Sequence, residues 1–341
     1  MKTKTRIVLT IFFSMLLLGS PLIAAKASSS ELTSSSVEAE QNYYSYGAYP
    51  LENNVEPLSP PQDTSGTPSH LDWRNLEYQG HNGNWLTSVK KQGDCGSCWA
   101  FAAVGAVEAM LNIQRENPSI DLDLSEQQLV SCCTHGCNGC HGGNSYLAWD
   151  YLMDHDGAIL ESTFPYYGID ANGCDSWKSE SCNRDPITCD MKEDGWEDIT
   201  IPLGEKGYYN DVDFSLAKYV LANHGPVVTF MLIYSDFNYY NGGIYTYDGN
   251  SDLLGGHAVM IVGYDDDQEY LICKNSWGSS WGEDGFFKIP HGECMLGTEL
   301  YFVDIDEDTL NFPPNAKLNG PYSGNANTSI QFSSEGTTDL D

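Results

Sequence analysis

Positively charged residues are scarce in this chain of 341 residues. It has 16 lysines and arginines against 48 aspartates and glutamates, so the formal net charge at pH 7 is −32. A surface of this sign repels nucleic acid and anionic membranes, so the sequence predicts no nucleic-acid partner. The acidity is typical of a solvated surface; salt tolerance and attraction of cationic substrates remain open as alternatives.

Long apolar runs are missing after the first residues. Residues 7–18 are apolar, follow a positively charged start, and precede a small-x-small site that ends at Ala27. The run is too short to span a bilayer comfortably. We therefore expect a cleaved signal peptide at residues 1–27, no membrane span after its removal, and a secreted, extracellular or cell-surface location. An N-terminal membrane anchor is the alternative.

Cysteine is abundant. The chain has eleven cysteines, which in an exported protein imply an oxidising compartment and a disulfide framework. Because eleven is odd, at least one thiol is free or bonded to another chain. The 41% hydrophobic and 12% aromatic content indicates a folded globular protein.

The composition divides the chain into segments. Residues 28–67 are rich in Ser, Glu, Asn and Pro, which predicts a linker or short pro-segment. From Leu71 the chain changes to apolar runs separated by turn signals. Residues 306–341 form another polar segment, which we interpret as a linker followed by a partial domain.

Helix signals gather in the front half of the folded part. Residues 98–115 are apolar nearly all round, which predicts a helix buried in a core. Ser125 followed by Gln128 forms a capping box that opens a second helix. Asn144 is expected to cap a third helix, and a fourth is expected at 213–223.

Strand signals gather in the back half. Short runs rich in branched and aromatic residues occur at 227–234, 257–264, 270–275 and 286–289. The pattern predicts an α+β protein with a mainly helical front half and a mainly β back half. A cleft between such halves is a common place for a site.

Cys98 is the candidate nucleophile. It lies where a glycine-containing loop enters the buried helix, and the partial positive charge of a helix N-terminus favours a thiolate. The pKa of a cysteine in such a place can fall from about 8.5 toward roughly 3.5–7.5. The alternative is a structural disulfide partner, a role that suits Cys95.

A nucleophilic thiol needs a base and a group that orients the base. His257 begins a β run among small residues, although a lone histidine is more often structural. Asn275 can accept a hydrogen bond from its imidazole, and Trp277 can shield that bond from water.

Together, in the order Cys, His, Asn, these residues match a known spacing. The run Gln92-Gly93-Asp94-Cys95-Gly96-Ser97-Cys98-Trp99 resembles the active-site signature of papain-like cysteine peptidases. The resemblance continues through further motifs: Leu71-Asp72-Trp73-Arg74, Leu124-Ser125-Glu126-Gln127, Gly139-Cys140-His141-Gly142-Gly143, Phe164-Pro165-Tyr166 and Asn275-Ser276-Trp277-Gly278.

The resemblance implies a papain-like two-lobed fold. We expect a helical N-terminal lobe at about 68–195 and an antiparallel β-barrel-like C-terminal lobe at about 196–305, with the active site in the cleft between them. Together they form a peptidase domain at 68–305.

The resemblance also implies a mechanism. The Cys98 thiolate and His257 imidazolium form an ion pair, and the thiolate attacks the scissile carbonyl. The Gln92 amide and the Cys98 backbone N–H hold the oxyanion. His257 then protonates the leaving amine and later activates the water that hydrolyses the thioester.

Substrate-binding residues follow in the same way. Gly142 and Gly143 resemble the family's backbone strand that binds an extended substrate. Glu299 falls at the floor of the S2 pocket, which implies acceptance of a basic P2 side chain, and Phe230 and Gly255 are expected to line that pocket. Trp277 completes the expected substrate-binding set. The alternative is that Glu299 is one more acid on an acidic surface.

The resemblance sorts ten cysteines into five disulfides and leaves Cys98 free. The expected pairs are Cys95 with Cys140, Cys132 with Cys174 and Cys273 with Cys294, with two further bridges among Cys133, Cys137, Cys182 and Cys189. A zinc site among the cysteines at 132–140 is the alternative. Export and an even count favour disulfides, so no metal and no cofactor are predicted.

Two departures from the family stand out. The family's long helical pro-region is absent; one hypothesis for latency places residues 43–49, rich in tyrosine, in the cleft. The tail from Pro314 resembles the opening of a PKD domain, broken off after its first strands, so we expect a fragment of a longer protein or a disordered tail.

The sequence thus predicts a secreted cysteine endopeptidase that acts on proteins or peptides, with a monomeric catalytic domain. A catalytically idle papain-like binding protein is one alternative. An exopeptidase is another, for which residues 135–141 are the only candidate histidine loop.

Overall fold

The computed structural model of the chain describes residues 47–51, 55–178 and 182–310. The expected signal peptide at 1–27 and the expected PKD-like tail lie outside these residues. Within them, no helix is both long enough and apolar enough to cross a membrane.

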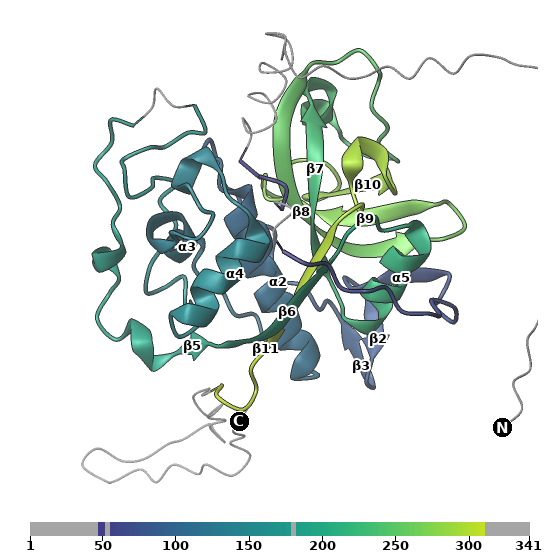
Figure 1. Cartoon of the computed structure of the whole chain (residues 1–341), viewed down its shortest axis with the longest axis horizontal. Coiled ribbons are helices and arrows are strands. Elements are labelled where there is room, and N and C mark those ends of the chain that lie inside the picture. The colour runs from purple at the N-terminus through teal and green to yellow at the C-terminus, as the bar shows by residue number, and fades with distance from the viewer. Residues whose placement is uncertain (1–46, 52–54, 179–181, 311–341) are drawn as a thin grey trace, which may run out of the picture.

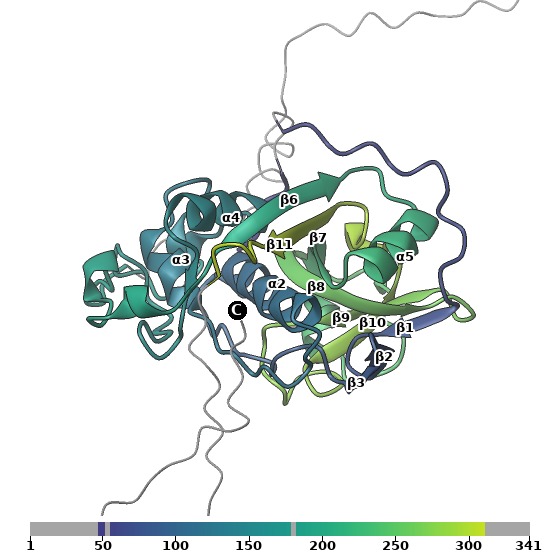
Figure 2. The same ribbon diagram turned by 90° about the horizontal axis from the view of Figure 1, so that it is seen from below.

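Helices and sheet occupy different halves of the molecule (Figure 1). α2 (Cys98–Gln114), α3 (Glu126–Cys132) and α4 (Ser145–Asp154) lie on one side, and the sheet and α5 (Phe214–Asn223) lie on the other. Figure 2 shows α2 between the two. Its residues 98–113 are all buried, because it packs against α4 on one side and against strands β8 (Leu253–Asp265) and β11 (Leu300–Ile305) on the other. The predicted two-lobed α+β fold is confirmed.

The two predicted helix caps, Ser125 and Asn144, are present, and a third cap occurs at Asp213. The Ser125 hydroxyl accepts a hydrogen bond from the Gln128 N–H at 3.0 Å. The Asn144 side chain accepts from the backbone at the start of α4, and Asp213 accepts from Leu216 at the start of α5. Each cap satisfies backbone donors that have no partner inside the helix.

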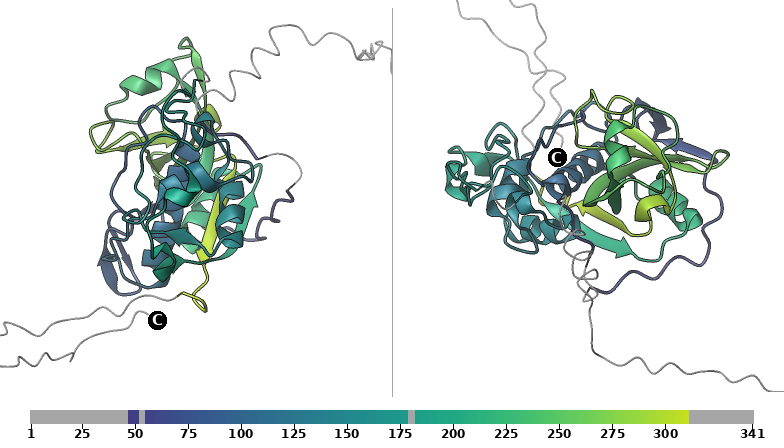
Figure 3. Two further views of the ribbon diagram at one scale, coloured as in Figure 1. Left: turned by 90° about the vertical axis from the view of Figure 1, so that its left-hand side faces the viewer. Right: turned by 90° about the horizontal axis from the view of Figure 1, so that it is seen from above.

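Seven antiparallel strands form the main sheet, in the order β10-β9-β8-β7-β11-β6 with β1 paired to β8. Their bounds are β1 (His70–Asp72), β6 (Leu203–Tyr209), β7 (Val227–Tyr234), β8 (Leu253–Asp265), β9 (Tyr270–Lys274), β10 (Phe286–Pro290) and β11 (Leu300–Ile305). Two small pairs lie apart: β2 (Leu76–Tyr78) with β3 (His81–Gly83), and β4 (Ala158–Ile159) with β5 (Thr200–Ile201). The other views in Figure 3 show the same arrangement.

The sheet differs from the expectation in two respects. β10 and β6 are its two ends and do not pair with each other, so the described strands do not close the barrel-like lobe that we expected. β6 and β11 were absent from the predicted strands, although they pair along most of their length.

Four disulfides are present, all in the helical half. Cys95–Cys140 agrees with the expectation. The expected pair Cys132–Cys174 is wrong, because Cys132 bonds to Cys189 and Cys174 bonds to Cys182; the fourth bridge is Cys133–Cys137. The expected Cys273–Cys294 bridge is also wrong: both thiols are free, as is Cys98. Cys273 is buried within β9, and Cys294 is partly exposed in a short 3-10 helix (Glu293–Met295).

Candidate active site

Cys98 is the first residue of α2, and its side chain is fully buried. Burial raises the pKa of its thiol to about 12, although the backbone N–H groups of Ala258, Trp99 and Cys98 itself act in the opposite direction by stabilising the thiolate. Because Ala258 follows His257 in β8, this contact brings the thiol against the strand that carries the expected base.

His257 and Asn275 are hydrogen bonded, with 2.9 Å between His257 Nε2 and Asn275 Oδ1. The register of the sheet causes this proximity, because Met260 of β8 lies opposite Lys274 of β9. The Trp277 ring lies over the imidazole at 5.2 Å between centroids. The other ring nitrogen, Nδ1, is buried and has no hydrogen-bond partner among the described residues.

The charge state of this pair departs from the expected ion pair. Burial lowers the pKa of His257 to about 4, against a smaller opposite effect of Asn275. Burial also raises the pKa of Cys98 to about 12, so the charged form is disfavoured in both members of the pair. The physical reason is the same for both: each side chain is shielded from water, and burial disfavours the charged form of any group.

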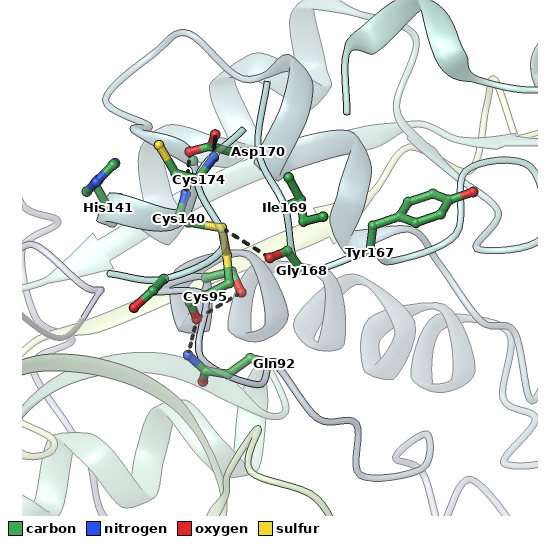
Figure 4. Close-up of a disulfide and its surroundings, with 12 residues drawn as sticks. Gln92, Cys95, Cys140, His141, Tyr167, Gly168, Ile169, Asp170 and Cys174 are labelled. Atoms are coloured by element: carbon green, nitrogen blue, oxygen red, sulfur yellow. Dashed lines mark hydrogen bonds between the residues drawn. A yellow bond between two sulfur atoms is a disulfide. The ribbon is translucent and has the colours of Figure 1, made fainter. Parts of the chain in front are cut away.

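Gln92 is held by hydrogen bonds at both ends of its side chain. Its Nε2 donates to the Cys95 carbonyl oxygen at 2.9 Å, and its Oε1 accepts from the Ser276 hydroxyl at 2.6 Å. Figure 4 shows the amide directed at Cys95, beside the Cys95–Cys140 disulfide. Neither Ser276 nor Tyr166 was predicted as a partner of Gln92; the Tyr166 hydroxyl donates to the Gln92 carbonyl oxygen at 2.7 Å.

A short stretch of the chain itself lies in the cleft. We call residues 47–51 the covering segment. Its Ala48 pairs with Gly143 as in a parallel sheet: the Gly143 N–H donates to Gly47 at 3.0 Å, and the Tyr49 N–H donates to Gly143 at 2.9 Å. On the opposite wall, the Ala48 N–H donates to the Gly256 carbonyl at 3.1 Å. The segment thus bridges the two halves, as the purple trace in Figure 1 shows.

The fit of the covering segment depends on glycines. A Cβ on Gly256 would lie 2.4 Å from the Ala48 oxygen, and a Cβ on Gly47 would lie 2.6 Å from the Gly96 oxygen. Gly47 also has φ of +120°, which other residues rarely adopt. The hypothesis of a tyrosine-rich stretch in the cleft agrees with Tyr49, whose hydroxyl donates to the His141 carbonyl; the tyrosines before residue 47 lie outside the described residues.

Glu299 reaches the covering segment at its far end. The Leu51 N–H and the Tyr301 hydroxyl both donate to its carboxylate, and burial raises its pKa. Of the other expected pocket residues, Phe230 packs against the Gly256 backbone. Gly256, the neighbour of Gly255 in β8, contacts Ala48.

A thiol at a helix start, a base oriented by an amide and a peptide-lined cleft between an α and a β half together define a cysteine peptidase. A model of the papain family of cysteine proteases matches residues 67–303, and the chain belongs to this family. The prediction of a cysteine-type peptidase is thereby confirmed.

Two curated relatives illustrate the similarity. A KDEL-tailed cysteine endopeptidase from Arabidopsis thaliana is 34% identical over 71% of this chain and 61% of its own length. Cathepsin L from Sarcophaga peregrina is 34% identical over 70% of this chain and 64% of its own length. The chain therefore spans somewhat less than two thirds of each of these relatives.

Solved structures of other cysteine proteinases have a similar fold. The digestive procathepsin L2 proteinase from Tenebrio molitor larval midgut superposes with a TM-score of 0.59 at 27% identity, over 78% of this chain and 80% of that one. ProCathepsin B S9 from Trypanosoma congolense gives a TM-score of 0.61 at 21% identity, over 79% of this chain and 88% of that one, a likeness of fold alone.

Proposed function

We propose that this chain is an exported cysteine endopeptidase that hydrolyses internal peptide bonds of proteins. Cys98 attacks the carbonyl carbon, its thiol proton passes to His257, and His257 delivers that proton to the leaving amine. Water then adds to the thioester, with His257 as the base, and the acid product leaves. Asn275 occupies Nε2 of the imidazole, which leaves Nδ1 for the thiol.

The covering segment carries this proposal. It is an extended peptide held by main-chain hydrogen bonds to Gly143 on one wall and Gly256 on the other. Main-chain bonds of this kind do not depend on side chains, so the same walls suit peptides of many sequences. Gly142 and Gly143 are therefore proposed as substrate-binding residues, and a substrate competes with the segment for them.

Oxyanion binding is assigned to the Gln92 amide and the Cys98 backbone N–H. An amide has two N–H donors, and one of those of Gln92 is used on Cys95. The second is available to an oxyanion near Cys98. The backbone donors at the start of α2 further favour negative charge there.

Hydrolysis of a long peptide by the full chain, followed by mass spectrometry of the products, tests the function. We expect internal cuts with the wild type and none with Cys98→Ala at unchanged melting temperature. Release of only single residues or dipeptides from an end would favour an exopeptidase. Turnover by Cys98→Ala equal to that of the wild type would contradict the assignment of the nucleophile.

A preference for basic P2 residues is proposed from Glu299. Its carboxylate already receives the N–H of Leu51 in the covering segment, so it faces a bound peptide. We expect reporter peptides with Arg at P2 to be cleaved faster than those with Phe, and Glu299→Gln to remove most of that difference. Replacement of the exposed Glu307 by Gln is the control. An Arg preference that survives Glu299→Gln would show that the acid does not set it.

A further inference from the structure

A hollow of about 250 Å³ lies next to the catalytic residues, on the Gln92 side. Gln92 and Asp94 line it on one wall, and Asn238 and Trp277 line it from the sheet half. Trp177 completes the lining from the helical half. Two indole side chains from different halves thus border one space.

Trp177 is held in place by the loop that carries it. The loop is closed by the Cys174–Cys182 disulfide, and the Trp177 N–H donates to the Asp94 carbonyl at 3.2 Å. A Cβ on Gly96 would lie 3.0 Å from the Trp177 Cβ. Trp177 therefore packs directly on the turn that leads to Cys98.

The position of His257 shows which side of a substrate meets this hollow. The leaving amine must come within hydrogen-bond reach of the imidazole that protonates it. Trp277 covers that imidazole, with 5.2 Å between ring centroids, and Trp277 also lines the hollow. The residue that begins the leaving peptide therefore projects its side chain toward the space between Trp277 and Trp177.

We propose that Trp177 is a specificity-determining residue that selects a large aromatic side chain on the leaving side of the scissile bond. The inference rests on the proposed peptidase function. Aromatic rings prefer offset or edge-to-face contact with one another, and the hollow offers an indole from each half. The charges of Lys91 and Asp94 at its rim are opposite, so they favour neither sign of substrate charge.

Two matched substrates test the assignment on the full chain. They are internally quenched peptides that differ only in Phe or Gly at the first leaving-side residue. A peptide methyl ester with the same acyl side serves as the third, because its leaving group carries no side chain. The chain is first incubated with casein until the rate of casein hydrolysis is constant. The value of kcat/KM is then measured for each of the three substrates.

For Trp177→Ala we expect the Phe-to-Gly ratio of kcat/KM to fall about threefold to tenfold. This factor corresponds to the interaction free energy of one aromatic pair. Trp177→Phe should retain most of the ratio, and ester turnover should stay unchanged in both variants. The matched control is Trp196→Ala. Each of the two tryptophans carries a lysine over its ring, Lys178 Nζ at 5.1 Å for Trp177 and Lys192 Nζ at 3.6 Å for Trp196, but Trp196 does not line the hollow.

The outcomes separate the two proposals. If the wild type hydrolyses none of the substrates, the proposed function fails and the inference falls with it. If the wild type is active and Trp177→Ala keeps the Phe-to-Gly ratio, only the role of Trp177 is overturned. If ester and peptide turnover fall together, Trp177 merely supports the turn before Cys98, and the specificity role is again overturned.

Discussion

Gln92 makes hydrogen bonds to both halves of the molecule. It bonds Cys95 in its own loop and Ser276 in the sheet half, and its backbone N–H donates to the Ser276 carbonyl at 2.9 Å. The residue therefore joins the two halves at the place where we propose that the oxyanion is held. Structural and catalytic effects of replacing it must be separated.

Gln92→Ala should lower kcat about 10²–10³-fold, the usual cost of one oxyanion donor. It also leaves the Ser276 hydroxyl and Cys95 carbonyl without their partner, which costs about 1–3 kcal/mol of stability. Ser276→Ala is the matched control, since it removes the same interhalf hydrogen bond but keeps the amide donor. Both variants should melt lower in calorimetry, and only Gln92→Ala should lose most of its turnover. Equal losses of turnover would refute a direct role for the amide.

At the scale of elements, α2 and α3 are joined by buried charges. Lys90 Nζ lies 2.9 Å from the carboxylates of both Glu108 on α2 and Glu126 on α3, and these charges raise its pKa against the effect of burial. Nearby Glu161 accepts the Tyr166 N–H at 2.7 Å. Burial raises the pKa of Glu161 to about 7.

The raised pKa of Glu161 makes the free energy of unfolding depend on pH. Between pH 4.5, its ordinary pKa, and about 7 the folded chain keeps a proton on Glu161 that the unfolded chain has released. The free energy of unfolding therefore falls as pH rises through this window. Glu161→Gln cannot ionise and should lose less stability over it than the wild type, as followed by the melting temperature. Glu307→Gln, an exposed acid, should keep the wild-type pH dependence; a parallel decline in Glu161→Gln would contradict the assignment.

Local sequence signals predicted the elements whose cause is local. The apolar stretch of α2 and the caps Ser125 and Asn144 each act within a few residues. β6 was missed because its sequence, Leu-Gly-Glu-Lys-Gly-Tyr-Tyr, has little alternation and forms a strand by pairing with β11 far along the chain.

The predicted pairing of Cys174 with Cys132 was wrong for a similar reason. Cys174 was expected to bond Cys132, but Cys182 and Cys189 offer two more partners, and four cysteines allow three pairings. The choice depends on a segment where Cys174 and Cys182 lie side by side in an isolated bridge, and where Cys189 begins a 3-10 helix (Cys189–Met191) next to α3. Such proximity cannot be read from spacing.

In the candidate site, residue types were predictable and their environment was not. The Cys, His, Asn and Gln positions follow from motifs, and the structure brings His257 and Asn275 into contact. Beside this pair, the contacts of residues 47–51 with Gly143 and Gly256 join three distant parts of the chain. Burial in this folded environment raises the pKa of the Cys98 thiol and lowers that of the His257 imidazole, and no motif reveals it.

For the whole molecule, the covering segment lies between the two halves, against Gly143 on one side and Gly256 on the other. A pKa raised from 9.0 to about 12 lowers the thiolate fraction near pH 8 about a thousandfold, since each unit is a factor of ten. The thiolate is the form that alkylating reagents attack. The rate of alkylation of Cys98 by iodoacetamide therefore reports whether the segment is in place.

Gly47→Val should displace the segment, because its Cβ would lie 2.6 Å from the Gly96 oxygen at a φ of +120°. We expect alkylation of Cys98 at pH 8 to accelerate by at least about tenfold and up to about a thousandfold. The matched control is Gly66→Val, where φ is +86° but no atom lies within 4 Å of the added Cβ; it brings the same backbone strain without the collision. Mass spectrometry of the Cys98 peptide gives the rate, and the partly exposed thiol of Cys294 is the internal reference within each sample. An unchanged rate at Cys98 in Gly47→Val would mean that the cleft walls themselves, and not the segment, keep the thiol from water.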